Sequence, residues 1–198
     1  MVKNQQKSLS SQSLARILQI TEELFAKRGY ERVSMREIAE AAGISKGLIY
    51  YHFKDKEDLY YHSIKEGVTI LLKQLSQAII AGKTPTEKIK IFISDYFKLL
   101  LEKEKLVKIL FQETGGIEGP VAKYIIQQSE NIISTLASVI KEGINEGEFR
   151  LTNARLTAAS LFGLLNVFVS EQVVSGEKVP VDILVEHTQA LFLNGICV

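Results

Sequence analysis

Residues 34–53, SMREIAEAAGISKGLIYYHF, predict two short helices joined by a tight turn. Ser34 and Glu37 have the spacing of a capping box, in which each side chain satisfies a backbone N–H of the first helical turn. Gly43 then ends this helix, and Ser45 can cap the next one. Two helices joined by a glycine-bearing turn form the helix-turn-helix pattern. A helical hairpin buried in a core would share the glycine but would leave the polar residues that follow unexplained.

The second of these helices carries polar and aromatic side chains more densely than a core helix would. In a helix-turn-helix, the second helix enters the DNA major groove while flanking elements contact the backbone. A lysine can reach guanine or a phosphate, a leucine can meet a thymine methyl group, and glycine allows a close approach. We therefore expect a DNA-binding surface made of Ser34, Arg36, Ser45, Lys46, Gly47, Leu48, Tyr50, Tyr51, His52, Lys54 and Lys56.

The charge distribution agrees with this expectation, although the net charge of +1 alone indicates no nucleic-acid partner. Residues 1–54 hold nine Lys and Arg against five Glu, whereas residues 55–198 hold fifteen against eighteen Asp and Glu. The single cysteine, Cys197, cannot form an internal disulfide, and the N-terminus lacks the apolar run of a signal peptide. The most apolar stretch, 158–169, is shorter than the about 20 residues of a membrane span. We expect a soluble, cytoplasmic protein with no membrane partner.

The rest of the chain repeats its apolar residues at helical spacing and nowhere alternates for long as a strand does. Thr152 is expected to cap a helix running from about residue 153 to 174. The predicted fold is all-α, with about nine helices. We place an N-terminal helix-turn-helix domain of three helices at residues 1–54. Residues 55–198 are expected to form a helical bundle for effector binding and dimerisation.

Residues 25–60, FAKRGYERVSMREIAEAAGISKGLIYYHFKDKEDLY, resemble the TetR (tetracycline repressor) family of bacterial transcriptional regulators. The glycine after the first helix, the SMREIA opening, the AG-S-KG turn and the YYHFKDKEDL ending all stand in the family's register. Leu48 departs from the pattern, since the family often has a small or hydroxyl-bearing residue there. The resemblance covers about a quarter of the chain. Beyond it, the agreement is in the number and placement of helices.

The resemblance implies a ligand-responsive regulator, in most cases a repressor, that binds a pseudo-palindromic operator as a homodimer. A small, largely apolar effector would release it, with the fourth helix linking the effector pocket to the DNA reader. No cofactor or metal is expected. The family's pocket lies in the helical body, where candidate lining residues are Phe92, Tyr96, Phe97, Phe111, Tyr124, Phe162 and Asn166. Aromatic residues at helical spacing are more often ordinary core.

The resemblance also implies that the last two helices pair with those of a second copy. The sequence supports this independently, because the helix near 153–174 is apolar on two sides and one side must face something other than its own domain. The expected interface residues are Leu161, Leu165, Phe168, Leu184, His187 and Leu191. The alternative is a monomer whose central helix is simply surrounded by its neighbours.

Two other classes of protein are alternatives to a regulator. An enzyme is disfavoured, since Gly82-Lys83-Thr84 resembles the end of a phosphate-binding loop but Gln77 stands where that motif needs glycine. The three histidines and the lone cysteine show no metal-ligand or catalytic spacing. A carrier of apolar ligands, or a helical adaptor, would explain the body but leave residues 45–56 without a role. The operator, the regulated genes, the effector and the sign of regulation are not specified by the sequence.

Overall fold

The computed structural model describes the backbone of residues 2–113, 119–175 and 178–198. Within these ranges, side chains are described from residue 13 onward, except those of 78, 80, 111–113, 174 and 175. The described part is built from α-helices, which confirms the all-α fold. They are α1 (Val2–Arg28), α2 (Met35–Ala42), α3 (Lys46–His52), α4 (Lys56–Ala81), α5 (Pro85–Glu102), α6 (Glu104–Glu113), α7 (Pro120–Glu146), α8 (Ala154–Ser170) and α9 (Val181–Ile196). A π-helical turn, Glu171–Ser175, continues α8.

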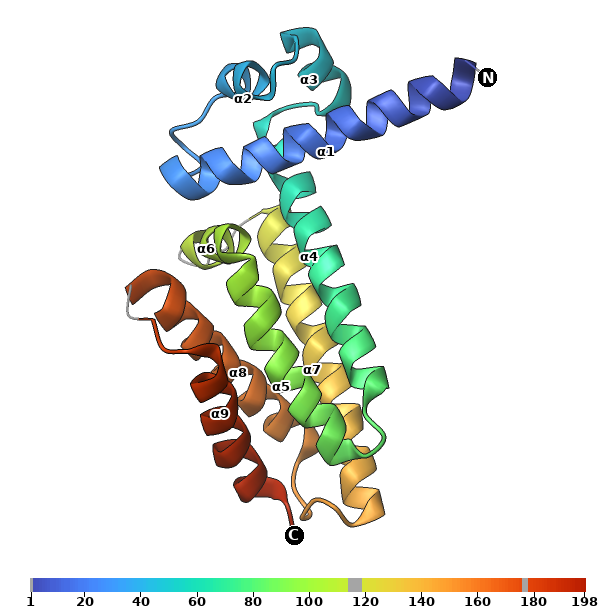
Figure 1. Ribbon diagram of the computed structural model, residues 1–198, viewed down its shortest axis with the longest axis vertical. Coiled ribbons are helices and arrows are strands. Elements are labelled where there is room, and N and C mark those ends of the chain that lie inside the picture. The colour runs from blue at the N-terminus through green and yellow to red at the C-terminus, as the bar shows by residue number, and fades with distance from the viewer. Residues whose placement is uncertain (1, 114–118, 176–177) are drawn as a thin grey trace.

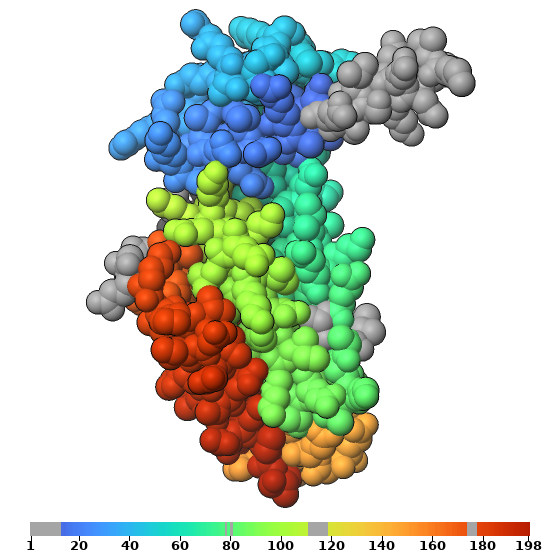
Figure 2. Space-filling view, viewed as in Figure 1, coloured from blue at the N-terminus to red at the C-terminus, as the bar shows by residue number. Residues whose placement is uncertain are grey.

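Helices α1, α2 and α3 form a head at one end of the molecule, and α4 runs from this head into the body (Figure 1). In the body, α5 and α7 lie alongside α4, and α8 and α9 lie along one outer edge. The short helix α6 lies between the body and α1. The space-filling view shows the same division into a head and a longer body (Figure 2).

Two clusters of buried apolar side chains hold these parts together. The bundle cluster joins residues of α4 to α9, with Phe92, Phe97 and Leu165 among its most buried members. The N-terminal cluster joins α1 to α4, but it also includes Leu106 and Ile109 of α6 and Val121 of α7. The core of the head is therefore completed by helices that come much later in the chain. The division at residues 54 and 55 stays a prediction.

The start of α8 differs from the expectation by one residue. Asn153, and not Thr152, is the N-cap, because its side-chain oxygen accepts a hydrogen bond of 3.1 Å from the backbone N–H of Leu156. The Thr152 hydroxyl lies 3.0 Å from that of Thr157 instead. Asparagine and threonine are both good caps, so composition alone did not separate them. The α-helix also ends at Ser170, before the expected residue 174.

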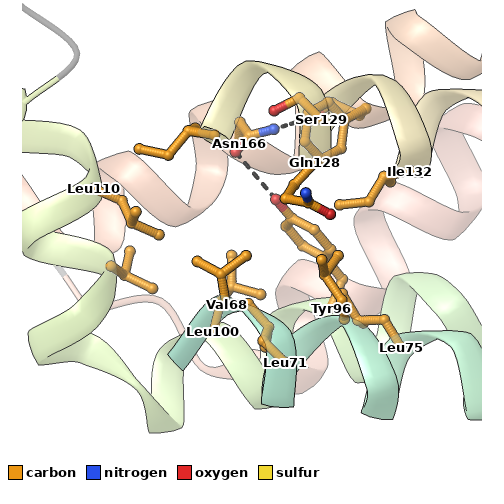
Figure 3. A pocket seen from close by; sticks show the side chains of 14 residues that line it. Val68, Leu71, Leu75, Tyr96, Leu100, Leu110, Gln128, Ser129, Ile132 and Asn166 are labelled. Carbon is orange, nitrogen blue, oxygen red and sulfur yellow. Dashed lines mark hydrogen bonds between the residues drawn. The ribbon is translucent and has the colours of Figure 1, made fainter. Parts of the chain in front are cut away.

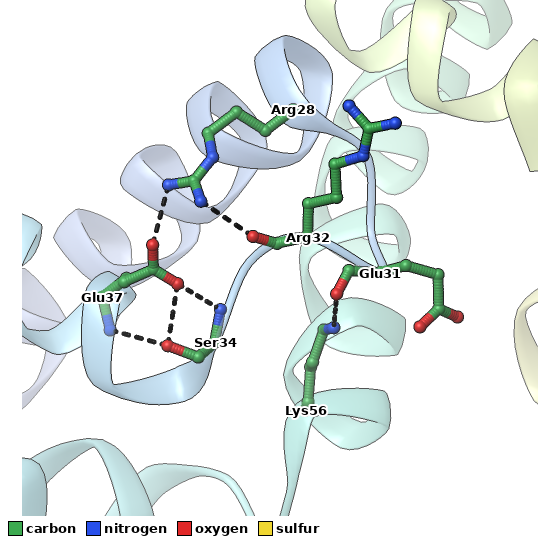
Figure 4. A network of polar contacts seen from close by, with 6 residues as sticks. All are labelled: Arg28, Glu31, Arg32, Ser34, Glu37 and Lys56. Carbon is green, nitrogen blue, oxygen red and sulfur yellow. Dashed lines mark hydrogen bonds and ion pairs between the residues drawn. The ribbon is translucent and has the colours of Figure 1, made fainter.

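A polar network fixes the start of α2 against the end of α1 (Figure 4). Glu37 accepts hydrogen bonds of 2.8 Å from both the backbone N–H and the hydroxyl of Ser34, which completes the capping box. Arg28 donates to the same carboxylate at 2.8 Å and, with its other nitrogen, to the carbonyl of Arg32. These hydrogen bonds from Ser34, followed by the one from Arg28, lower the pKa of Glu37 to about 2.

This lowered pKa gives an acid-sensitive contribution to stability. Because the folded-state pKa lies below the ordinary value of 4.5, the contribution is complete above that pH and is lost as the pH falls towards about 2. We expect Glu37→Gln to lower the melting temperature at pH 6 and to flatten its decline between pH 4.5 and 2. Thermal unfolding followed by circular dichroism across that range measures this. Glu40→Gln, which removes an exposed carboxylate from the same helix, is the matched control and should keep the wild-type pH profile.

Candidate DNA-binding and effector sites

The exposed face of α3 presents the side chains that the sequence singled out. Ile49 is fully buried and Phe53 is 2% exposed, so together they anchor the helix to the head. On the other side, Lys46 and Gly47 are exposed, and Tyr50 and Tyr51 are 46% and 77% exposed. Helices α2 and α3 lie at the end of the molecule away from the body (Figure 1). This face is therefore open to a large partner.

The glycine on this face is not required by the protein's own packing. A Cβ added to Gly47 would meet only the Ser45 hydroxyl oxygen, 3.9 Å away. Ser45 caps α3 by accepting a hydrogen bond from the backbone N–H of Leu48, whose side chain is half-buried. A glycine costs helix stability relative to alanine. Its presence in an open position fits a surface that another molecule must approach closely.

Some of the residues expected to contact DNA are engaged within the protein. His52 is half-buried, its Nε2 atom is buried, and its ring packs against Tyr51 and Phe53. Lys56 donates to the carbonyl of Glu31 (Figure 4). Its ammonium nitrogen also lies 4.1 Å from the ring centre of Tyr30. In this conformation both side chains support the head, and a contact of either one with DNA stays a prediction. The partners of Lys56 lie some 25 positions earlier in the chain, so local sequence gave no sign of them.

The two residues expected to contact DNA at the start of α2 differ in whether their side chains are free to do so. The Ser34 hydroxyl is used in the capping box with Glu37. Arg36 forms an ion pair of 2.8 Å with Glu40, but its side chain stays 79% exposed. Lys54 is exposed beyond the end of α3. Arg36 and Lys54 can therefore reach a DNA backbone with no rearrangement of the core.

Arg16 is a further candidate for DNA contact, in addition to the residues expected from the sequence. It is exposed on α1, and its guanidinium lies 3.3 Å from the position that a Cβ on Gly43 would take. A cationic group thus stands beside the turn between α2 and α3. Its place on the polar side of α1 indicated exposure, but only the packing of α1 against the turn places it near the DNA-facing elements.

A cavity of about 280 Å³, here called the central cavity, lies inside the body between α4 and α8 (Figure 3). Its walls are mostly aliphatic, and its polar groups are a phenol, two amides and a hydroxyl. The lining residues are Val68, Leu71, Leu72, Leu75, Tyr96, Leu100, Val107, Leu110, Ile125, Gln128, Ser129, Ile132, Phe162 and Asn166. A mostly apolar cavity with a few polar groups is the usual form of a small-molecule site.

The polar groups of the central cavity are electrically neutral. The Tyr96 hydroxyl donates a hydrogen bond of 3.1 Å to Asn166, whose amide donates to the carbonyl of Phe162 at 2.7 Å (Figure 3). Burial raises the pKa of Tyr96 well above its ordinary value, so this residue stays protonated. None of the described lining residues is an acid, a lysine, an arginine or a histidine. A buried unpaired charge is costly, so this cavity favours an uncharged hydrocarbon.

A second cavity of about 240 Å³, here called the side cavity, adjoins the first and shares Leu72, Leu75, Gln128 and Ile132 with it. It lies along the seam between α4 and α7 and has a more polar lining. Its other lining residues are Ser76, Ile79, Phe92, Asn131 and Thr135. The two cavities together therefore pass from an apolar interior to a rim of neutral hydrogen-bonding groups.

Only some of the expected pocket residues line one of the two cavities. Tyr96, Phe162 and Asn166 line the central cavity, and Phe92 lines the side cavity. Phe97 does not fit the expectation, because it is fully buried in the bundle cluster with its ring packed near Phe168.

The structure also corrects the expectation that Tyr124 lines the pocket, and it does not test the same expectation for Phe111. The Tyr124 hydroxyl lies 3.2 Å from that of Thr69 and its ring packs on Tyr61, against the N-terminal cluster. The side chain of Phe111 lies outside the described residues. The aliphatic lining residues of α4 were not predicted from the sequence, since a leucine stripe predicts core as readily as a cavity wall.

The outer face of α8 and α9 is apolar and uncovered. Leu156, Val167, Ile183 and Leu191 are each 55–65% exposed, and a Cβ added to Gly163 or Gly195 would meet nothing within 4 Å. We define the outer face as Leu156, Ser160, Gly163 and Val167 of α8 with Ile183, His187, Leu191 and Gly195 of α9. Figure 2 shows α9 uncovered along the side of the body. Among the described helices, Ala154–Val173 is also long and apolar enough to cross a membrane by length and composition.

Only part of the expected interface lies on this face. Leu161 and Leu165 are fully buried in the protomer's own core and Leu184 is 7% exposed, so these three expectations are corrected. Phe168 is half-buried, with its ring near that of His187. His187 and Leu191 are exposed as expected for a docking face.

Comparison with known proteins assigns this chain to a protein family. The family model of bacterial regulatory proteins of the tetR family matches residues 17–61, and that of the tetracyclin repressor-like C-terminal domain matches residues 82–170. The fatty acid metabolism regulator protein of Bacillus subtilis is 26% identical over 181 residues, which cover 91% of this chain and 93% of that one. The transcriptional repressor KstR2 of Mycolicibacterium smegmatis is 25% identical over 68% of this chain and 66% of its own length.

Solved structures of related proteins support the same family assignment. FadR from Bacillus subtilis, in complex with stearoyl-CoA, matches with a TM-score of 0.82 and 26% identity over 91% of this chain and 98% of that one. FadR from Bacillus halodurans matches with a TM-score of 0.80 and 25% identity over 92% and 95%. The chain belongs to the TetR family and is a DNA-binding transcriptional regulator, not an enzyme.

Proposed function

We propose that the protein is a cytoplasmic repressor that binds a pseudo-palindromic operator as a homodimer and leaves it when an acyl-chain effector enters the central cavity. The observation that carries the DNA-binding part is the open face of α3. Lys46, Tyr50 and Tyr51 are exposed there, around a glycine that the fold does not need. The helix is held from behind by Ile49 and Phe53, so this face can enter a groove without disturbing the core.

The homodimer is supported by the outer face of α8 and α9. Its exposed apolar residues repeat along both helices, and its two glycines leave room for a second helix to approach closely. Two-fold pairing of identical faces is the commonest arrangement of soluble oligomers. Such pairing would bury the apolar side of α8 in a protein interface, so that no lipid bilayer is needed to cover it. It would also place one α3 helix at each of two operator half-sites.

The acyl-chain effector is supported by the chemistry of the two cavities and by the relatives. The central cavity offers aliphatic walls and neutral hydrogen-bonding groups, which suit a hydrocarbon chain joined to an uncharged carbonyl. The related FadR of Bacillus subtilis is known in complex with stearoyl-CoA. In an acyl thioester, the charged part of the molecule would stay outside the central cavity, beyond the polar rim of the side cavity.

The first test is to select binding sites from random duplex DNA at near-physiological salt and to sequence what the protein retains. We expect an enriched pseudo-palindrome, with two half-sites spaced by about one duplex turn of 34–36 Å. Affinity for that site should fall steeply with salt, by about 0.9 in log–log slope for each phosphate neutralised. Retention that is indifferent to sequence would refute the proposal, and an enriched single half-site would refute the dimer.

A further inference from the structure

We infer that the protein carries a second ligand site, for a small polyphosphate such as that of a nucleotide, at the junction of the head and the body. The site is a surface depression of about 450 Å³, here called the basic depression, where the end of α1, the connection from α1 to α2, and α6 meet. It shares no lining residue with the central cavity or the side cavity. This inference is therefore independent of the acyl-chain effector.

The charged groups around the basic depression are mostly cations. Lys27, Arg28 and Arg32 line it from the head, and Lys108 lines it from α6. Glu31 is the single acid among its lining residues. Figure 4 shows the Glu31 carboxylate and the Arg32 guanidinium pointing in different directions. A concave surface with an excess of one charge concentrates counter-ions, so this one attracts anions.

Lys27 and Lys108 lack the partners that the local sequence offers them. On a helix, an acid four residues before a lysine is its usual partner. Glu23 has that place for Lys27, but it pairs with Lys105 at 3.2 Å. Glu104 has the same place for Lys108, but it pairs at 3.4 Å with a lysine of the connection between α8 and α9. Within the described part of the chain, both lysines are exposed and without an ion pair.

The two arginines of the basic depression differ in role. Arg28 donates to the Glu37 carboxylate and to the carbonyl of Arg32, each at 2.8 Å (Figure 4). The second hydrogen bond fixes the backbone that carries Arg32, whose own side chain is exposed and forms no ion pair with the described residues. The dipole of α1 favours cations in its last turn, which accounts for Lys27 and Arg28. It does not account for Arg32 or Lys108, which lie outside this helix.

Three unpaired cations on three segments define the chemistry of the ligand. A guanidinium donates two parallel hydrogen bonds to a phosphate, and lysines add point charges. The carbonyl end of α1 opposes an anion with only about half a charge, which the three cations outweigh. The depression also falls in the range of about 300–1,000 Å³ that small-molecule sites occupy, so a nucleoside has room beside the phosphates.

DNA bound to the reading face does not cover the basic depression. Helices α2 and α3 lie on one side of α1, at the end of the molecule, whereas α6 lies on the other side, towards the body (Figure 1). The protein can therefore hold an operator and a polyphosphate together. The bound anion would join Lys108 of the body to Lys27 and Arg32 of the head.

The test measures the binding of three probes to the full-length protein by isothermal titration calorimetry, without magnesium. The probes are inorganic tripolyphosphate, ATP and coenzyme A, of which the last two distinguish a free nucleotide from a thioester as the source of the phosphates. A salt concentration of about 0.15 M largely screens attraction between distant exposed charges. We expect saturable binding of tripolyphosphate and of at least one of the other two, with one site per chain.

Two variants locate this binding. Joint replacement of the three unpaired cations, by Lys27→Gln, Arg32→Gln and Lys108→Gln, should weaken it by about 100-fold or more, since each charged contact contributes roughly tenfold. Arg32→Lys keeps the charge but loses the pair of parallel hydrogen bonds, so it should weaken binding by about 3- to 10-fold. This single exchange of an exposed side chain carries the test if the triple variant melts at a lower temperature than the wild type.

The matched control makes the same change in net charge on the body. It combines three exposed lysines of α5 and α7, as Lys90→Gln, Lys98→Gln and Lys141→Gln, and should bind the probes as the wild type does. Lys46→Gln on α3 should also keep this binding. The inference would be overturned if no probe bound, if the two triple variants weakened binding equally, or if Lys46→Gln abolished it. The last result would place the anion on the reading face.

Discussion

Val167→Arg is expected to convert the protein to a monomer and to weaken operator binding by about 10²- to 10⁴-fold, the usual gain from linking two binding sites. Val167 is 58% exposed on the outer face of α8, beside Gly163, where two copies would approach most closely. Two-fold symmetry would place two arginines in an apolar interface, and burying unpaired charge is strongly unfavourable. Sedimentation velocity and operator anisotropy on the same samples measure both effects.

Leu151→Arg is the matched control for this change. Leu151 is 90% exposed between α7 and α8 and lies outside the outer face, so its replacement should leave the dimer and the operator affinity unchanged. A Val167→Arg protein that remained dimeric would place the interface elsewhere. A monomer that bound the operator as tightly as the wild type would show that dimerisation is not needed for reading DNA.

Tyr51→Ala should weaken operator binding by about 10- to 1,000-fold, since a lost contact recurs in both half-sites. The ring is 77% exposed, so its removal should change the free energy of unfolding by no more than about 0.5 kcal/mol. Operator titrations paired with urea denaturation separate the two quantities. Ile126→Ala, which truncates a half-exposed side chain on α7, should alter neither. A Tyr51→Ala protein that lost stability and affinity together would point to a structural role for this ring.

Local signals explain why the helices were predictable from the sequence. Ser34 with Glu37, and Gly43 in its left-handed conformation, mark their helix ends through contacts within a few residues. The exposed side of α3 followed in the same way, because Ile49 and Phe53 fix which side faces inward. The capping of α8 by Asn153 was missed by one position, since two suitable residues are adjacent.

The remaining site residues depend on packing between distant segments. The sequence shows that α8 is apolar on two sides, but only its neighbours decide that Leu161 and Leu165 face the core while Val167 faces outward. The sequence suggested that the Lys56 side chain is free to contact DNA, whereas in the structure it contacts the ring of Tyr30 and the carbonyl of Glu31. The central cavity was hidden for another reason, because aliphatic walls around empty space and aliphatic residues in a filled core give the same pattern.

The shared core also limits how such regulators can be recombined. A chimera that joined residues 1–54 of this protein to the body of a relative would lose Leu106, Ile109 and Val121, which complete the core of its head. The transplanted segment would meet foreign side chains at three buried positions at once. Exchange of operator specificity, in the laboratory or by gene fusion, would have to carry the matching surface of α6 and the start of α7 along with the reading helices.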